Sequence, residues 1–205
     1  MKKKIQSTKE NQAMSPNKAF EAHRTSANGF ASTNSQSFNS IDITEVILQD
    51  HRPLKALIKI LKDNKTLRSE KEENLEEFAV LLLAHSKAEE QTLYVAMKDY
   101  ENLKVGSFEG ETEHAMAEQL VQEINASPND YEWLAKVKVL AEIVEHHIAE
   151  EENDVLKDVQ KNIPESERFL IGAEYQKLIS ELRMLNFRQA PRKIKYNVVH
   201  SSHSN

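Results

Sequence analysis

Two segments of the chain carry a histidine followed four residues later by a glutamate. HSKAEEQTLY and HIAEEENDVL align so that the pairs His85/Glu89 and His147/Glu151 correspond. Side chains four residues apart lie on one face of a helix, separated by about 6 Å along the axis. Imidazole and carboxylate groups without thiolates suit iron, manganese or zinc. Each segment is therefore predicted to present two metal ligands on one helical face.

A further histidine precedes each pair. DHRPL (50–54) stands 63 residues before EHAMA (113–117), so His51 leads His85 by 34 residues and His114 leads His147 by 33. The sequence thus repeats a hairpin of two helices, each with one lone histidine and one His-x-x-x-Glu. A glutamate from each hairpin could bridge two metals while the histidines fill terminal positions. A ferritin-type site needs two Glu-x-x-His motifs and is disfavoured, because only Glu111/His114 has that order.

A metal-free core is the alternative interpretation of these residues. A lone histidine on an apolar stripe is usually a satisfied core residue, a glutamate run is usually a solvated face, and His146/Glu150 has the same spacing. Burial favours a metal, because a buried carboxylate costs several kcal/mol unless it is paired or metal-bound. No lysine or arginine lies on the inner stripes to pair with Glu89 and Glu151. A dication would neutralise both.

Two positions near these motifs are decided by helix rotation. His147 follows Val144 by three residues and is predicted to face the core, whereas His146 is predicted to face outward. Glu118, four residues after His114, could be a further ligand or a surface residue. Tyr94 and Trp133 are interpreted as packing residues.

The elements that must position these side chains are helices. Apolar residues recur with helical periodicity between residues 42 and 185. The capping boxes 42–45 and 69–72, and Ser127 followed by a proline, predict helix starts. Pro53 predicts either a kink or a restart within the first helix. The expected helices start at 42, run from 69 to about 100, span 111–125, run from 127 to about 162 and from 164 to 185, with 100–111 as a glycine-containing connection.

This pattern predicts an all-α, antiparallel up-down four-helix bundle over 42–162, built from two repeated hairpins. A C-terminal helix at 163–185 is expected to pack on it. Residues 1–41 are polar and aperiodic and are expected to be a disordered tail, with a basic flexible tail at 186–205.

The charge is concentrated in the helical part. The whole chain has a net charge of −6, and each tail carries +4, which leaves −14 on residues 42–185. This balance argues against a nucleic-acid groove in the bundle. The longest apolar run covers only 78–84, and no secretory signal or cysteine occurs. We therefore expect a cytoplasmic protein without a membrane or nucleic-acid partner.

The order His, His-x-x-x-Glu, His, His-x-x-x-Glu in DHRPL, HSKAEEQTLY and HHIAEEENDVL resembles the hemerythrin-like HHE family over about 42–160. The resemblance implies a non-haem di-iron centre with an Fe–O–Fe unit and bridging carboxylates; manganese or zinc is less favoured. It implies that four histidines are terminal ligands and that two glutamates bridge the metals: His51, His85, His114 and His147, with Glu89 and Glu151. On two octahedral metals these ligands and the oxygen bridge would leave at most two positions open for a small ligand, and one fewer if Glu118 also binds.

The chain departs from the oxygen-carrying hemerythrins, which have a fifth histidine where Glu118 stands here. It is more similar to bacterial four-His, two-Glu members, which include iron-centre repair proteins and peroxide- or nitric-oxide-reactive proteins. The cysteine-bearing segment of the repair proteins is not found. The implied function is reaction with, or sensing of, oxygen, peroxide or nitric oxide, in oxidative or nitrosative stress or iron handling. An iron or oxygen storage or sensing module without turnover, and a metal-free helical interaction protein, are the alternatives.

Overall fold

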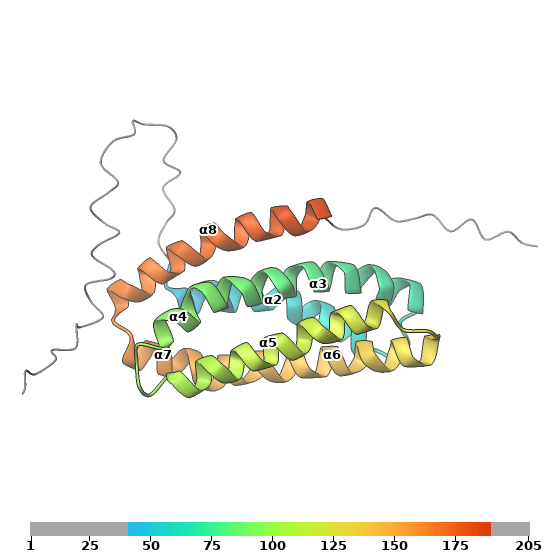
Figure 1. Ribbon diagram of the computed structural model, residues 1–205, viewed down its shortest axis with the longest axis horizontal. Helices are drawn as coiled ribbons and strands as arrows, with labels where there is room; N and C mark the ends of the chain where they lie inside the picture. The colour runs from blue at the N-terminus through green and yellow to red at the C-terminus, as the bar shows by residue number, and fades with distance from the viewer. Residues whose placement is uncertain (1–40, 190–205) are drawn as a thin grey trace, which may run out of the picture. The chain divides into compact units, whose positions relative to one another are not determined.

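The computed structural model describes residues 41–189, and this part of the chain contains helices and connections but no strand. Figure 1 shows the long helices lying side by side as a bundle, with α4 continuing the line of α3 and α7 that of α6. The predicted all-α bundle with a C-terminal helix is confirmed. The predicted tails lie almost wholly outside the described residues. The bounds are α2 Ile43–Lys62, α3 Arg68–Gln91, α4 Leu93–Met97, α5 Lys104–Asn125, α6 Asp130–Glu150, the π-helix η1 Glu151–Val155, α7 Leu156–Asn162 and α8 Glu165–Gln189.

The start of α2 agrees with the predicted cap, although the hydrogen bond differs. Asp42 is the N-cap, and its Oδ1 accepts from the backbone N–H and the hydroxyl of Thr44 rather than from the N–H of Glu45. The second carboxylate oxygen accepts from Arg168 Nε of α8 at 2.7 Å. The cap therefore also ties the C-terminal helix to the start of the bundle.

Two other predicted helix starts are wrong. Ser69 lies inside α3, which begins at Arg68 without a side-chain cap. Instead, Arg68 pairs with Glu72 and Asp130, and these charged contacts stabilise the first turn. In α6 the cap is not Ser127 but Asn129, whose side chain accepts from the N–H of Glu132 at 3.0 Å.

The predicted connection at 100–111 is also wrong, because α5 already begins at Lys104. Gly106 and Gly110 lie within this helix rather than in a turn. A Cβ atom at position 110 would overlap the Tyr94 hydroxyl and would lie 2.6 Å from Tyr94 Cζ. Gly110 is therefore required by close packing of α4 against α5, a cause that local propensity cannot indicate.

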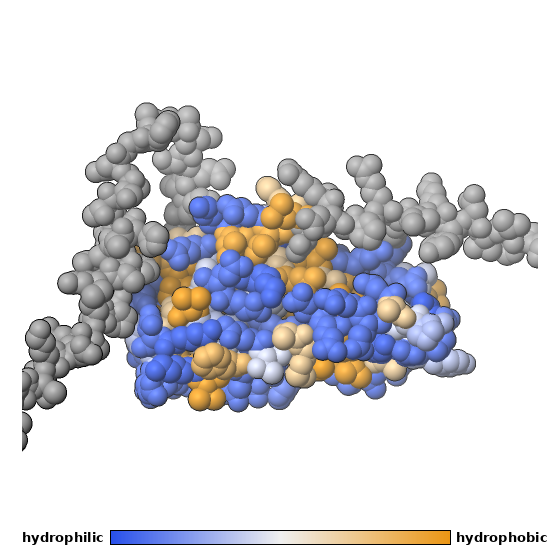
Figure 2. All heavy atoms as spheres, in the orientation of Figure 1, coloured by the Kyte–Doolittle hydropathy of each residue, from blue (hydrophilic) through white to orange (hydrophobic). Residues whose placement is uncertain are grey.

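The apolar core is divided into two clusters. One cluster includes Ile47 and Tyr175, and the other includes Leu54 and Phe78. On α2, His51 stands between Ile47 and Leu54, so polar residues occupy the level at which one cluster ends and the next begins. The buried side chains of α8 pack into the first cluster, and Figure 2 shows apolar patches on an otherwise mainly hydrophilic face. Among the described helices, none is both long and apolar enough to span a membrane.

Candidate metal centre

The bundle brings all six predicted ligands together, with each glutamate between two histidines from different helices. Glu89 Oε2 lies 3.2 Å from His85 Nε2 and 3.4 Å from His114 Nε2. Glu151 Oε2 lies 3.2 Å from His51 Nε2 and 3.6 Å from His147 Nε2. All six side chains are buried. The two hairpins thus contribute equivalent sets of groups to one cluster.

The donor atoms form two overlapping sets suited to metal ions. His51, His85, Glu89 and Glu151 offer atoms within 4.8 Å of one another, and Glu89 joins His114 and His147 in a second such set. Glu89 belongs to both sets, as a bridging carboxylate would.

The hydrogen bonding of the same atoms tests whether a metal fits. Within residues 41–189, both Glu89 oxygens, Glu151 Oε2 and the Nε2 atoms of His51 and His85 are buried without a hydrogen-bond partner. Buried polar atoms normally form hydrogen bonds, so five buried nitrogen and oxygen atoms without a hydrogen bond in one cluster require an explanation. Since imidazole nitrogens and carboxylate oxygens are metal ligands, the cluster could hold a metal cation.

The other ring nitrogen of each histidine points away from the cluster to an outer partner. His51 Nδ1 lies 3.1 Å from Glu152 Oε1, His114 Nδ1 lies 3.4 Å from Glu90 Oε1, and His147 Nδ1 lies 2.6 Å from Glu113 Oε2. For His51 and His147 the carboxylate can accept a hydrogen bond from Nδ1–H, which leaves the Nε2 lone pair free to accept. His114 Nδ1 forms no hydrogen bond with Glu90, and its Nε2 instead lies 3.1 Å from His147 Nε2, at hydrogen-bond distance.

His85 has a different partner. Its Nδ1 lies 2.8 Å from the hydroxyl of Tyr175, which belongs to α8. That hydroxyl donates to Asp50 Oδ2 at 2.8 Å, and Arg183 pairs with the other Asp50 oxygen at 3.0 Å.

Sequence reasoning missed these outer residues, although the repeat contains a signal for four of them. Glu90 and Glu152 follow Glu89 and Glu151, and Asp50 and Glu113 precede His51 and His114. The acid–histidine and glutamate–glutamate doublets therefore recur with the ligands. Tyr175 has no counterpart in the repeat, and only the position of α8 reveals it.

The two buried carboxyl groups of the cluster have strongly shifted pKa values, in opposite directions. Burial and the neighbouring charge of Glu151 raise the pKa of Glu89 well above its usual range. Burial would also raise the pKa of Glu151, but the adjacent His147 and His51 rings lower it below its ordinary value. Burial and the nearby His51 ring hold the pKa of His85 well below its usual range, which favours the neutral imidazole that binds metals.

Tyr94 contacts the centre as well as packing beside it. Its hydroxyl donates to Glu151 Oε1 at 2.9 Å, and its ring stacks on His114 with centroids 5.5 Å apart. Burial and the charge of Glu151 raise the pKa of this phenol well above its ordinary value. Trp133 lies in the apolar core, with the Arg68 guanidinium over its ring.

Regular α-helical geometry ends at or just after each of the two buried glutamates. The π-helix η1 follows α6 directly and starts at Glu151 itself, and three residues after Glu89 the backbone breaks at Thr92, with φ −127° and ψ −79°. Helix irregularities of this kind are frequent at functional sites, because they redirect side chains. Pro53 lies inside α2, which continues through it.

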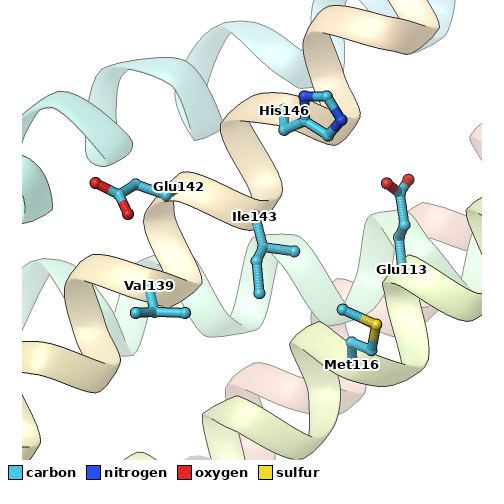
Figure 3. A pocket seen from close by; sticks show the side chains of 6 residues that line it. All are labelled: Glu113, Met116, Val139, Glu142, Ile143 and His146. Atoms are coloured by element: carbon cyan, nitrogen blue, oxygen red, sulfur yellow. The ribbon is translucent and has the colours of Figure 1, made fainter.

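His146 and Glu118 lie outside the buried cluster. The His146 side chain is 67% exposed and pairs with Glu150, whereas the His147 side chain is 5% exposed, so the predicted helix rotation is confirmed. Glu118 is half-buried, with its side chain 40% exposed, and lies 3.5 Å from Lys87. Figure 3 shows His146 beside an outer hollow between α5 and α6, lined also by Glu113 and Met116. None of the six candidate ligands lines this hollow, although Glu113 contacts His147.

A helical bundle with a buried histidine–carboxylate centre defines a class of metal-binding proteins. Comparison with known families identifies which one: the hemerythrin HHE cation-binding domain matches residues 42–159, and the chain belongs to this family. A relative from Nostoc sp., named a DNA nickase, is 26% identical over 164 residues, which cover 76% of this chain and 44% of the relative. The chain therefore spans less than half of that relative. No solved structure gives a significant match.

Proposed function

We propose that the bundle binds two iron ions through His51, His85, His114, His147, Glu89 and Glu151, and that this centre reacts with or senses oxygen, peroxide or nitric oxide. The observation that carries the proposal is the position of Glu89. Its carboxylate is buried, lacks a hydrogen bond within the described residues and belongs to both donor sets. One cation would leave the second set unused, whereas two cations would use both.

The protein groups around the centre support a reactive role. Bound iron would supply open positions for a small ligand and the electrons to reduce it. Tyr94 holds its proton on an oxygen 2.9 Å from Glu151 Oε1 and so orients that carboxylate. The apolar clusters on both sides exclude water from the centre.

The test is metal analysis of purified protein together with its visible spectrum. Roughly two Fe per chain are expected, with a ferric spectrum that changes on addition of azide. Reduced protein should be oxidised rapidly by oxygen, peroxide or nitric oxide. Reversible oxygenation over many cycles would instead indicate a carrier, and absence of iron after anaerobic loading would refute the di-iron proposal.

Steady-state consumption of peroxide or nitric oxide distinguishes an enzyme from a storage or sensing protein without turnover. If the iron-loaded protein consumes peroxide or nitric oxide in the steady state, it is an enzyme for that substrate. If it reacts once and stops, a sensing or storage role in stress or iron handling is supported.

The name of the Nostoc relative raises DNA cleavage as a second candidate function. The net charge of −14 on residues 42–185 opposes approach of a phosphate backbone to the bundle, so we propose no nucleic-acid partner for this region. Incubation of iron-loaded protein with supercoiled plasmid tests this. Nicked circles formed by the wild type and not by His147→Ala would establish the activity.

A further inference from the structure

The two hairpins differ in the group that contacts Nδ1 of the histidine in each His-x-x-x-Glu pair. In the second hairpin, Glu113 directly precedes His114 and contacts His147 Nδ1 at 2.6 Å. The equivalent residues of the first hairpin are Asp50, which precedes His51, and His85. Aspartate is one methylene shorter than glutamate, and the Tyr175 hydroxyl occupies the space between Asp50 and His85, 2.8 Å from each.

We propose that Tyr175 is a positioning residue for the metal centre, so that α8, which lies outside the family match at 42–159, is part of the site. This inference rests on the proposed function for its effect on iron. A phenol has a single proton, and here it is donated to Asp50. Toward His85 the oxygen can therefore only accept, so the His85 proton resides on Nδ1 and the Nε2 lone pair faces Glu89.

The packing of α8 holds the Tyr175 hydroxyl in place between Asp50 and His85. The Tyr175 side chain is fully buried, and Arg183 from the same helix pairs with Asp50. At the other end of α8, Arg168 is bound to the cap of α2. Docking of α8 thus orients the phenol, and the phenol selects the ring tautomer of His85.

Removal of the hydroxyl makes the opposite tautomer favourable. In Tyr175→Phe the His85 Nδ1–H would be buried without an acceptor, whereas a proton on Nε2 could be donated to Glu89 Oε2, 3.2 Å away. That arrangement removes the lone pair that a metal needs. Changes to the outer partners of metal-bound histidines typically weaken metal affinity by about 10- to 100-fold.

The matched control is Tyr100→Phe. It also deletes a tyrosine hydroxyl bound to α8, since Tyr100 Oη donates to Glu167 at 2.8 Å, but that hydroxyl contacts none of the six ligands. Iron affinity should fall by about 10- to 100-fold in Tyr175→Phe and change less than about twofold in the control.

A second readout does not depend on metal. Histidine ring ¹⁵N spectra of the metal-free full chain should show His85 protonated on Nδ1 in the wild type and Tyr100→Phe, and on Nε2 in Tyr175→Phe. Adding Asp50→Glu to Tyr175→Phe should restore the Nδ1 proton and iron affinity, because the longer side chain reproduces the direct contact of Glu113.

The outcomes separate the two proposals. A wild type that binds no iron refutes the proposed function, while the ring spectra still test the tautomer. A wild type that binds iron, with Tyr175→Phe matching it in both affinity and His85 tautomer, overturns the inference. Failure of Asp50→Glu to restore either property overturns the role given to the carboxylate at position 50.

Discussion

Gly106 and Gly110 lie one helical turn apart in α5, yet alanine should have opposite effects at the two positions. Glycine in a helix interior is about 1 kcal/mol less favourable than alanine. A Cβ atom at position 106 would meet only Met97 Cε, at an ordinary distance of 3.7 Å. Because Gly106 is the third residue of α5 rather than an interior one, Gly106→Ala is expected to stabilise the protein by at most about 0.5–1 kcal/mol.

At position 110 the same methyl group meets the Tyr94 ring, with Cζ at 2.6 Å and Cε2 at 2.8 Å. Overpacking of this kind costs about 1–3 kcal/mol. Displacement of Tyr94 would also break its hydrogen bond to Glu151, and a bond to a charged group contributes about 1.5–3 kcal/mol. After the gain of about 1 kcal/mol in helix propensity, Gly110→Ala should destabilise the protein by roughly 1.5–5 kcal/mol.

Urea denaturation of the wild type and both variants, with and without iron, measures these free energies. A double-mutant cycle of Gly110→Ala with Tyr94→Phe should show a coupling of about 1 kcal/mol or more, because removal of the hydroxyl relieves the closest overlap. Equal stability of Gly106→Ala and Gly110→Ala would refute the argument that Gly110 makes room for Tyr94.

Four further predictions follow from the site and from the docking of α8. His147→Ala should lose iron while His146→Ala retains it, measured by metal content; the reverse result would contradict the observed rotation of α6. Chelation should lower the melting temperature by roughly 10 °C, because metal at about 1,000 times Kd contributes about 4 kcal/mol; unchanged melting would contradict metal binding in the core. Gly172→Ala should destabilise the protein more than Gly110→Ala in urea, because its Cβ would overlap a backbone carbonyl oxygen, which cannot rotate away; a neutral effect would contradict the docking of α8. Partial burial raises the pKa of Asp42, but the hydrogen bond from Arg168 has the opposite effect, and the net result is a pKa below the ordinary value. The stabilising charge of Asp42 is therefore present above about pH 4 and is lost as pH falls through the folded-state pKa. The stability difference between wild type and Asp42→Asn should therefore be constant above about pH 4 and shrink below it, as measured by urea denaturation across pH; a difference that grows on acidification would contradict this sign.

The helical fold and the six candidate ligands could be predicted from the sequence because both depend on local spacing. His85 and Glu89 share a helical face wherever that helix lies, and the repeat at 147–151 places an equivalent pair in a second helix. No lysine or arginine lies on the inner faces beside Glu89 and Glu151, so the two buried carboxylates were predicted to share one metal site. The rotation that turns His147 inward and His146 outward was predicted from the apolar stripe together with the repeat, because Ala84 stands in the first hairpin where His146 stands in the second.

The contact between His85 and Tyr175 and the packing around Gly110 were decided only by tertiary structure. His85 and Tyr175 are 90 residues apart, and no periodicity connects them; they meet because α8 docks beside α2 and α3. Gly110 was misassigned to a connection because its role is to accommodate Tyr94 from another helix. A helix's amphipathic face can be computed from its own residues, whereas the partner of a buried ring nitrogen depends on how helices distant in sequence pack.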